Sequence, residues 1–148
     1  MASRNKALKL GPGGELYIDE SDIQRNCVRW FRIVHREIAL LLFSIPNGAQ
    51  MGGKRSKTGH AIQASVMIGE GLTAGVADLF LSVAASGLHG LYIEMKTPVG
   101  KWDKEQREFA ARVVAQGYGY CLCRTRDAFE KEVEAYLKGT YVQAKIIG

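Results

Sequence analysis

The sequence predicts a mixed α/β fold (an α+β mixed sheet) with helices and strands in the order α-β-α-β-β-α-β-α. Three observations lead to this order. Apolar residues recur every three or four positions in several stretches, which is typical of amphipathic helices. In other stretches apolar and polar residues alternate or form short apolar runs, as in strands. Glycine and proline stand between the two kinds of stretch and mark the turns.

The composition indicates one globular domain. The chain has 148 residues, 47% apolar and 24% charged, which suffices for a core and is too apolar for a disordered chain. We expect a loose segment at residues 1–15 and a single domain at residues 16–148. The three cysteines offer no second Cys/His pair for zinc, so we expect them to be reduced and buried. The net charge of +5 suits a polyanionic partner without requiring one.

The first half of the domain contains two predicted helices and one strand. A helix is expected from Glu20 to about Arg36, because its apolar residues share one face: Ile23, Cys27, Trp30, Phe31 and Val34. Its acidic start suits a helix N-terminus. The apolar run before the turn at residues 46–48 is expected to be a short strand, and residues 61–72 a second helix that ends at glycines.

The second half of the domain begins with a predicted hairpin. Its strands cover residues 75–83 and 91–96, and its turn lies near Gly87. A helix is then expected from Asp103 to Gln116, ended by a glycine. A short strand at residues 119–125 and an amphipathic helix at residues 126–138 complete the domain.

The hairpin carries charged residues on one face of each strand. Alternation separates Asp78 from Leu79 and places Glu94 and Lys96 together on one face. With the turn near Gly87, directly opposed residues have numbers that sum to about 174, so Asp78 lies across from the Glu94 and Lys96 end. The sequence therefore predicts that two carboxylates and one ammonium group meet where the strands end.

This set of charges suggests a chemistry. Two neighbouring carboxylates repel each other unless a cation or a proton lies between them. Oxygen ligands of this kind suit Mg²⁺ or Mn²⁺, which also bind phosphate oxygens. A lysine beside the ion orients or deprotonates a water, or neutralises charge on a phosphate. The set predicts metal-assisted cleavage of a phosphodiester, although a cross-strand salt bridge on a solvated face explains the same residues.

The chain also resembles a known family. Asp78 followed by Glu94-Met95-Lys96 looks like the core of the PD-(D/E)xK nucleases. More closely, nearly the whole chain from about Glu20 resembles the VRR-NUC family of virus-type replication-repair nucleases. The stretches that carry the resemblance are ESDIQRNCVRWFR, SIPNGAQ, GLTAGVADLFL, GLYIEMKTPVGKWDKEQREF and GYGYCLCRTRDAFEKEVEAYL. It implies a restriction-endonuclease-like core.

The resemblance implies roles for the residues of the motif. Asp78 and Glu94 would bind the metal together with the backbone carbonyl of Met95. Lys96 would be the catalytic lysine. Ala77 stands where the wider superfamily has a proline, a residue that the metal does not require.

Two residues on helices complete the site that the resemblance implies. Gln106 would orient the lysine or a phosphate. Glu20 would reach the metal through water, with Gln24 one turn away on the same helical face. Each has a plainer alternative, since Gln106 also suits an exposed helix position and Glu20 a helix N-terminus. The turn at Asn47 and Gly48 would lie near the site or be only a turn.

Phosphate contacts need cations, which the sequence offers in two places. One is a glycine-rich loop that contains Lys54, Arg55 and Lys57. The other follows the second strand of the hairpin and contains Lys101, Trp102 and Lys104. Trp102 would stack on an unpaired base or wedge a junction. The alternative is a solvated charged surface with Trp102 packed on the domain.

Together these features predict a DNA endonuclease with Mg²⁺ or Mn²⁺ as cofactor. Stand-alone members of the resembled family are homodimers that act on four-way (Holliday) junctions, which implies a homodimer and branched DNA here. Trp30 and Phe31 are candidates for the dimer interface. Two alternatives stay open: a flap, nicking or nonspecific nuclease, and a non-catalytic DNA-binding module. With no signal peptide or membrane-length apolar run, we expect a cytoplasmic protein of a bacterium or a phage-infected cell.

Overall fold

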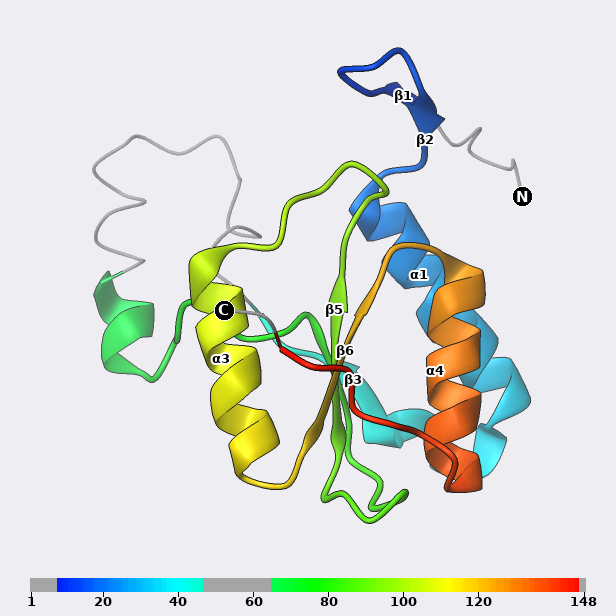
Figure 1. Ribbon diagram of the computed structural model, residues 1–148, viewed down its shortest axis with the longest axis vertical. Coiled ribbons are helices and arrows are strands. Elements are labelled where there is room, and N and C mark those ends of the chain that lie inside the picture. Colours follow the sequence, from blue (N-terminus) through cyan, green and yellow to red (C-terminus); the bar gives the residue numbers. More distant parts are fainter. Residues whose placement is uncertain (1–7, 47–64, 147–148) are drawn as a thin grey trace.

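The described residues, 8–46 and 65–146 of the computed structural model, form a central four-stranded mixed sheet (Figure 1). The strand order is β3-β4-β5-β6, with β3 at Leu42–Ser44, β4 at Leu79–Leu81, β5 at Leu91–Met95 and β6 at Gly119–Cys123. β3, β4 and β5 pair antiparallel, and β6 runs parallel to β5. The predicted mixed α/β fold is thereby confirmed.

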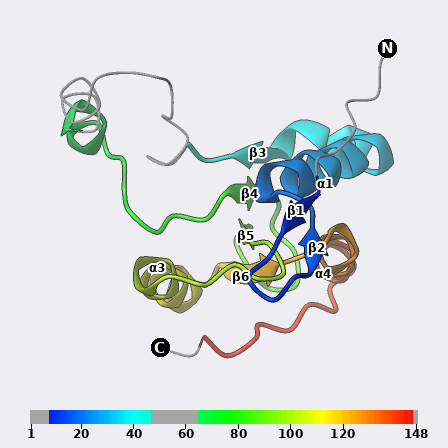
Figure 2. The ribbon, with the colours of Figure 1, turned by 90° about the horizontal axis from the view of Figure 1, so that it is seen from above.

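Helices cover both faces of this sheet (Figure 2). α1 (Glu20–Val34) and α4 (Arg126–Lys138) pack together on one face, and α3 (Lys104–Ala115) covers the other. A 3₁₀ helix, η1 (Arg36–Leu41), joins α1 to β3. Residues 65–69 are also helical. None of the helices in the described part of the chain has the length and apolar content needed to cross a membrane.

α3 is the crossover between the parallel strands β5 and β6, which a hairpin cannot join. Its start is fixed by a capping box, in which Asp103 and Gln106 each accept a hydrogen bond from the other's backbone N–H. Gly117, with φ at +88°, follows its last turn in the left-handed conformation that favours glycine. Gln106 consequently lies in the first helical turn after the end of β5.

Most of the core lies between the sheet and the helices α1 and α4. Its buried residues are Ile23, Cys27, Phe31, Leu42, Leu79, Leu81, Leu91, Ile93, Met95, Cys121, Cys123, Phe129, Val133 and Tyr136. A smaller cluster beneath α3 contains Ala77, Ala110 and Tyr120. The cysteines are buried and unpaired, as expected. Burial raises the pKa of the Cys27 thiol to about 12, so this side chain behaves as a small apolar group.

The segment after α4 covers the outer edge of β6. The Tyr120 N–H donates to Oε1 of Gln143 at 2.7 Å, and Nε2 of Gln143 donates to the Tyr120 carbonyl at 2.9 Å. The Tyr141 hydroxyl donates to the same carbonyl at 3.0 Å. One side-chain amide therefore satisfies both backbone groups of Tyr120, as a neighbouring strand would.

Two strands are shorter than predicted. Part of the apolar run that was expected to be a strand before the turn at residues 46–48 forms η1, so that β3 begins only at Leu42. The strand expected at residues 75–83 is reduced to Leu79–Leu81. Strands of three residues are too short to produce a periodic signal that separates them from a turn of helix. The predicted helix at residues 61–72 is helical at 65–69, and its first residues lie outside the described ranges.

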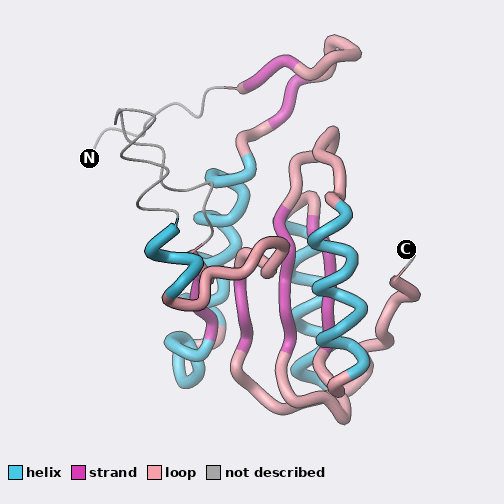
Figure 3. Tube along the Cα trace, turned by 90° about the vertical axis from the view of Figure 1, so that its left-hand side faces the viewer, coloured by secondary structure: helices cyan, strands magenta, loops and turns pink. Residues whose placement is uncertain are grey.

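A small hairpin lies in the segment expected to be loose. β1 (Lys9–Leu10) pairs antiparallel with β2 (Leu16–Tyr17), and the hairpin extends from the start of α1 away from the sheet (Figure 3). Its turn contains Gly14 with φ at +84°. Nζ of Lys9 lies 2.7 Å from the carboxylate of Asp19, just before α1. The sequence analysis missed this hairpin because each strand has only two residues.

Gly75 brings the segment before Asp78 against the first turn of α3. Its φ is +80°, and a Cβ at this position would lie 2.3 Å from the backbone oxygen of Glu105. Gly71 also has a positive φ, of +105°, but a Cβ there would have no atom within 4 Å. A comparison of the two positions therefore distinguishes the cost of a positive φ from the cost of a close contact with the backbone of α3.

We expect Gly75→Ala to destabilise the protein much more than Gly71→Ala. Both substitutions put alanine in a left-handed conformation, which costs about 1 kcal/mol. Only Gly75→Ala also forces a side chain against the backbone of α3, which costs about 2 kcal/mol more. Urea denaturation of both variants measures the difference, and equal losses of stability would contradict the close approach.

Candidate active site

The predicted site residues meet at one end of the sheet. β5 ends there, α1 and α3 begin there, and the chain enters β4 from there (Figure 1). Asp78 directly precedes β4, Glu94 lies near the end of β5, and Lys96 directly follows β5. These three residues therefore approach one another from the ends of two neighbouring strands.

The register of the hairpin brings Asp78 opposite Glu94. Leu79 pairs with Ile93, so the numbers of opposed residues sum to 172, and continuing the ladder by one residue joins Asp78 to Glu94. The sequence predicted a sum of about 174, two residues further along. One of these residues arises because the β4 side holds one residue more than the β5 side between the ladder and the bridge from Ala85 to Leu88. The other arises because that bridge centres the turn between Ser86 and Gly87 and not at Gly87.

Asp78 is held by the backbone of β5. The residue is 6% exposed, and its Oδ2 accepts a hydrogen bond from the Met95 N–H at 2.8 Å. Burial raises the pKa of Asp78, against the smaller lowering effects of this N–H and of Lys96. The hydrogen bond fixes the carboxylate at the end of β5.

Glu94 is more deeply buried and uses one oxygen twice. The residue is 1% exposed. Its Oε1 accepts from Nζ of Lys96 at 2.9 Å and from Nε2 of Gln106 at 2.5 Å. Its Oε2 is buried and has no hydrogen-bond partner in the described part of the chain. Burial, together with the charge of Asp78, raises the pKa of Glu94 to about 7.

Lys96 keeps its charge in this environment. Its side chain is 12% exposed. Burial lowers the pKa of Lys96, but the hydrogen bond and charge of Glu94 outweigh this effect, and the pKa is raised overall. The group is therefore a fixed cation beside two carboxylates.

Gln106 links the site to α3. Its Oε1 accepts the Asp103 N–H at 3.0 Å, while its Nε2 donates to Glu94. The side chain is half-buried and held at both ends, so it is not an ordinary exposed helix residue. It orients the carboxylate of Glu94, whereas contact with the lysine or a phosphate stays a prediction.

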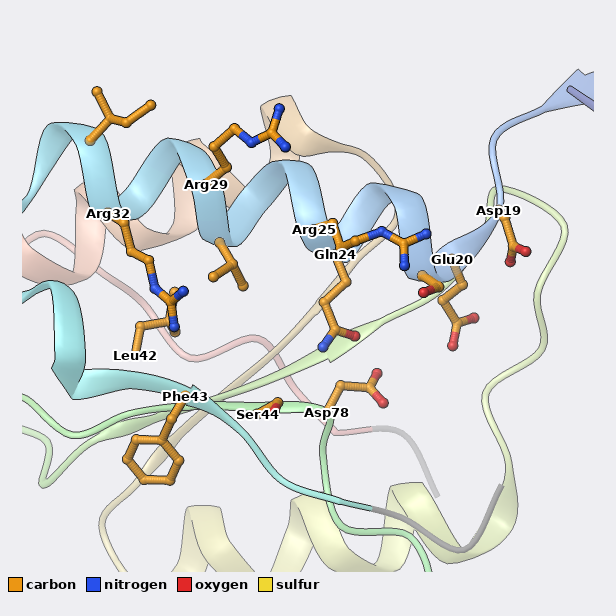
Figure 4. Close-up of a pocket in the computed structure, with 13 residues that line it drawn as sticks. Asp19, Glu20, Gln24, Arg25, Arg29, Arg32, Leu42, Phe43, Ser44 and Asp78 are labelled. Carbon is orange, nitrogen blue, oxygen red and sulfur yellow. The ribbon is translucent and has the colours of Figure 1, made fainter. Parts of the chain in front are cut away.

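Glu20, the first residue of α1, lines the same cleft as Asp78 (Figure 4). Partial burial raises the pKa of Glu20; Lys96 opposes this effect and Asp78 adds to it. Glu20 therefore faces the same cleft as Asp78, and its contact with a metal through water stays a prediction. Gln24, one turn further along α1, lines the cleft as well.

Sequence analysis missed the arginines that line this cleft. The cleft has a volume of about 780 Å³ and runs between α1 and β3. Arg25, Arg29 and Arg32 contribute to it from α1, and Phe43 and Ser44 from β3. In Figure 4 the side chain of Arg32 points toward β3, whereas the guanidinium group of Arg29 and the ring of Phe43 point away from the space between α1 and β3. The spacing of the arginines, i, i+4 and i+7, was a readable signal for one helical face. Only the packing of β3 beside α1 makes that face the wall of a cleft.

Of the cations predicted to contact DNA, the two in the described ranges do not line this cleft. Lys101 and Lys104 are exposed, and Nζ of Lys104 lies 3.7 Å from the carboxylate of Glu108. Trp102 stacks on Tyr120 with ring centroids 5.9 Å apart, in the cluster beneath α3. Lys54, Arg55 and Lys57, like the turn at residues 47–48, lie outside the described residues. Contact of any of these residues with DNA stays a prediction.

The donor set was tested for a divalent metal. Within residues 8–46 and 65–146, no three His, Cys, Asp or Glu side chains cluster closely enough to hold an ion by themselves. Asp78 and Glu94 would therefore need a backbone carbonyl, such as that of Met95, and water to complete a shell, which Mg²⁺ accepts readily. The buried Oε2 of Glu94 without a partner and its raised pKa are the features that a cation would relieve. The residues fit a divalent ion.

Comparison with solved structures identifies the fold. One structure, described as "VRR_NUC domain protein", superposes with a TM-score of 0.65 over 87% of this chain and 96% of that chain. The chain has the VRR-NUC fold. The two sequences are 18% identical, so the likeness concerns the fold alone. No protein-family model and no curated protein matches the chain.

We expect Glu94→Gln to stabilise the metal-free protein as the pH rises. The folded-state pKa of Glu94, about 7, exceeds its ordinary value of 4.5, so the folded state retains the proton between these values and loses stability as the pH rises through them. The stability advantage of the variant should grow from about 1 kcal/mol at pH 5 to roughly 3 kcal/mol at pH 8. Denaturation in EDTA at both pH values measures this, and a pH-independent difference would contradict it.

We also expect Mn²⁺ to raise the melting temperature of the wild type at pH 8. An ion between Asp78 and Glu94 offsets their repulsion and binds only the folded state. Asp78→Asn should abolish the shift, although asparagine still offers an acceptor to the Met95 N–H. Thermal melts with Mn²⁺ and with EDTA test this, and an equal shift in the variant would place the ion elsewhere.

Proposed function

We propose that the protein is a metal-dependent nuclease that hydrolyses DNA phosphodiesters. The observation that carries the proposal is the buried pair of Asp78 and Glu94 with Lys96 at 2.9 Å from Glu94, at the end of the sheet in a VRR-NUC fold. Two desolvated carboxylates are unfavourable for stability alone. Buried carboxylates that repel each other in this way are typical of sites that bind a cation and act on a substrate.

Each residue of the site has a distinct role in this proposal. Asp78, Glu94 and the Met95 carbonyl would hold the ion, which would supply polarisation of the scissile phosphate and activation of the attacking water. Lys96 remains charged and would stabilise the negative charge that builds on the phosphate. Gln106 keeps Glu94 in place, because its amide is fixed by the capping box. Glu20 would contact the ion through water.

We further propose that the substrate is branched DNA, with a four-way junction cut by a homodimer. A two-fold dimer presents two sites, as paired cuts of a symmetric junction require. The interface needs a revision, because Phe31 is 0% exposed and Trp30 packs on His35 and Phe129. The exposed apolar residues nearby are Ile33, Val34, Leu40, Leu41 and Phe43. The cytoplasm of a bacterium or a phage-infected cell is the proposed location.

We expect cleavage of junction DNA to require Mg²⁺ or Mn²⁺ and to stop in EDTA. Lys96→Ala should lower the rate by roughly 10²- to 10³-fold, the usual effect of removing one charge-stabilising donor. Asp78→Asn should be equally impaired through loss of the ion. Lys131→Ala, at an exposed position of α4, is the matched control and should cleave normally. Activity that persists in EDTA, or in both site variants, would sink this mechanism.

The same assay separates the alternatives. Products mapped on junction, flap, nicked and linear duplex DNA distinguish a junction nuclease from a flap, nicking or nonspecific enzyme. Tight binding that needs no metal, with no cleavage under any metal, would instead indicate a non-catalytic DNA-binding module.

A further inference from the structure

We infer that the cleft between α1 and β3 binds the sugar-phosphate backbone of the strand that is cut, through arginines of α1. The inference rests on the proposed nuclease function and adds the surface that guides the substrate. Arg25, Arg29 and Arg32 line one wall of the cleft, and Asp78 lies in the same cleft (Figure 4). A strand seated against the arginines would therefore lead to the proposed metal site.

The spacing of the arginines suits consecutive phosphates. Residues at i, i+4 and i+7 lie on one face of a helix, and seven residues span about 10 Å along its axis. Neighbouring phosphates of one strand are about 3.4 Å apart along the duplex axis and further apart along the strand itself, so the wall matches about two phosphates. The guanidinium group also binds phosphate in a bidentate manner.

Two of these arginines are uncommitted within the protein. Arg29 and Arg32 are exposed, and neither forms an ion pair or side-chain hydrogen bond with the described residues. Arg25 differs, because it lies 2.5 Å from the carboxylate of Asp22. Arg126, on α4, is also paired, with Glu130 at 2.5 Å. The charges of Arg29 and Arg32 are thus available to an external anion.

The opposite end of the cleft has the opposite charge. Asp19, Glu20 and Asp78 line the cleft beside the start of α1. A nucleic-acid strand that is cleaved would use both ends of the cleft. The arginines would bind its phosphates, and the carboxylates would bind the cation that acts on the phosphodiester. An acidic peptide would use only the arginines and would be repelled by the carboxylates. The distribution of charge therefore favours a nucleic-acid strand.

The facing wall of the cleft contains Ser44 of β3. The ring of Phe43 points away from α1 in Figure 4 and packs against Phe80, with ring centroids 5.7 Å apart, so it does not face the arginines. The contacts inferred here are therefore to the sugar-phosphate backbone and not to the bases.

The test compares two double variants that remove the same charge. Arg29→Gln/Arg32→Gln changes the cleft, and Lys131→Gln/Lys145→Gln changes exposed residues outside it. Both are made in a Lys96→Ala background, so that binding of a branched DNA in Mg²⁺ is measured without cleavage. Glutamine favours helix about as well as arginine, and circular dichroism melts verify folding.

We expect the arginine variant to weaken binding about ten-fold or more. The slope of log Kd against log salt should fall by about 1.5, because two phosphate contacts are lost. The lysine variant should change this slope by less than about 0.5, since its charges touch no phosphate. With Lys96 restored, the arginine variant should raise KM and change kcat by only a few-fold. Equal effects of the two double variants would overturn the inference.

A phosphate-specific experiment locates the contacts. Neutral methylphosphonates replace single phosphates two to four positions from the cut on the cleaved strand. The neutral phosphates should weaken binding of the DNA to the wild-type cleft. They should not weaken binding to the arginine variant, because that variant has already lost the contact to the same phosphate. Equal losses in both proteins would overturn the inference.

The outcomes also separate this inference from the proposed function. Cleavage by the wild type, together with unchanged DNA binding by the arginine variant, would support the nuclease function and contradict the role of the cleft. Arginine-dependent binding of DNA without cleavage under any metal would support the role of the cleft and contradict the nuclease function. Absence of DNA binding removes both.

Discussion

The desolvated carboxylate of Glu94 determines how this end of the molecule is built. A charge at 1% exposure is costly unless its oxygens are compensated. Oε1 is compensated by Lys96 just beyond the same strand and by Gln106 on α3, whereas Oε2 has no hydrogen-bond partner in the described part of the chain. Gln106 can serve because the capping box holds its other end, and that box exists because α3 starts directly after the loop that follows β5. The same residue, Gln106, therefore fixes the start of α3 and holds the carboxylate of the site.

Sequence reasoning recovered the parts of the molecule with strong local patterns. α1, α3 and α4 are long enough for apolar periodicity, and β5 and β6 are continuous apolar runs between clear turns. Asp78, Glu94 and Lys96 could be brought together because strand alternation and one hairpin turn restrict their positions. The error of two residues in the register came from an extra residue on the β4 side and from a turn centred just before Gly87, neither of which a local pattern reveals.

What sequence reasoning missed depends on contacts between distant segments. Arg29 and Arg32 look like ordinary solvated helix residues until β3 closes the other wall of their cleft. Phe31 looked suitable for an interface, yet α4 and the sheet bury it completely. Trp102 likewise stacks on Tyr120, so the loop after β5 contacts β6, although the whole of α3 separates the two residues in the sequence. In each case the environment of a side chain is set by an element far away in the chain.

The amide of Gln143 has a consequence for how copies of this protein can associate. It occupies the N–H and carbonyl of Tyr120 that another β-strand would otherwise use. At the other border of the described sheet, β3 has only three residues and gives an incoming strand little to pair with. Neither border invites growth of the sheet from molecule to molecule, which limits the risk of fibrous aggregation. Two copies that associate through the described sheet would therefore meet through side chains and not by pairing strand edges.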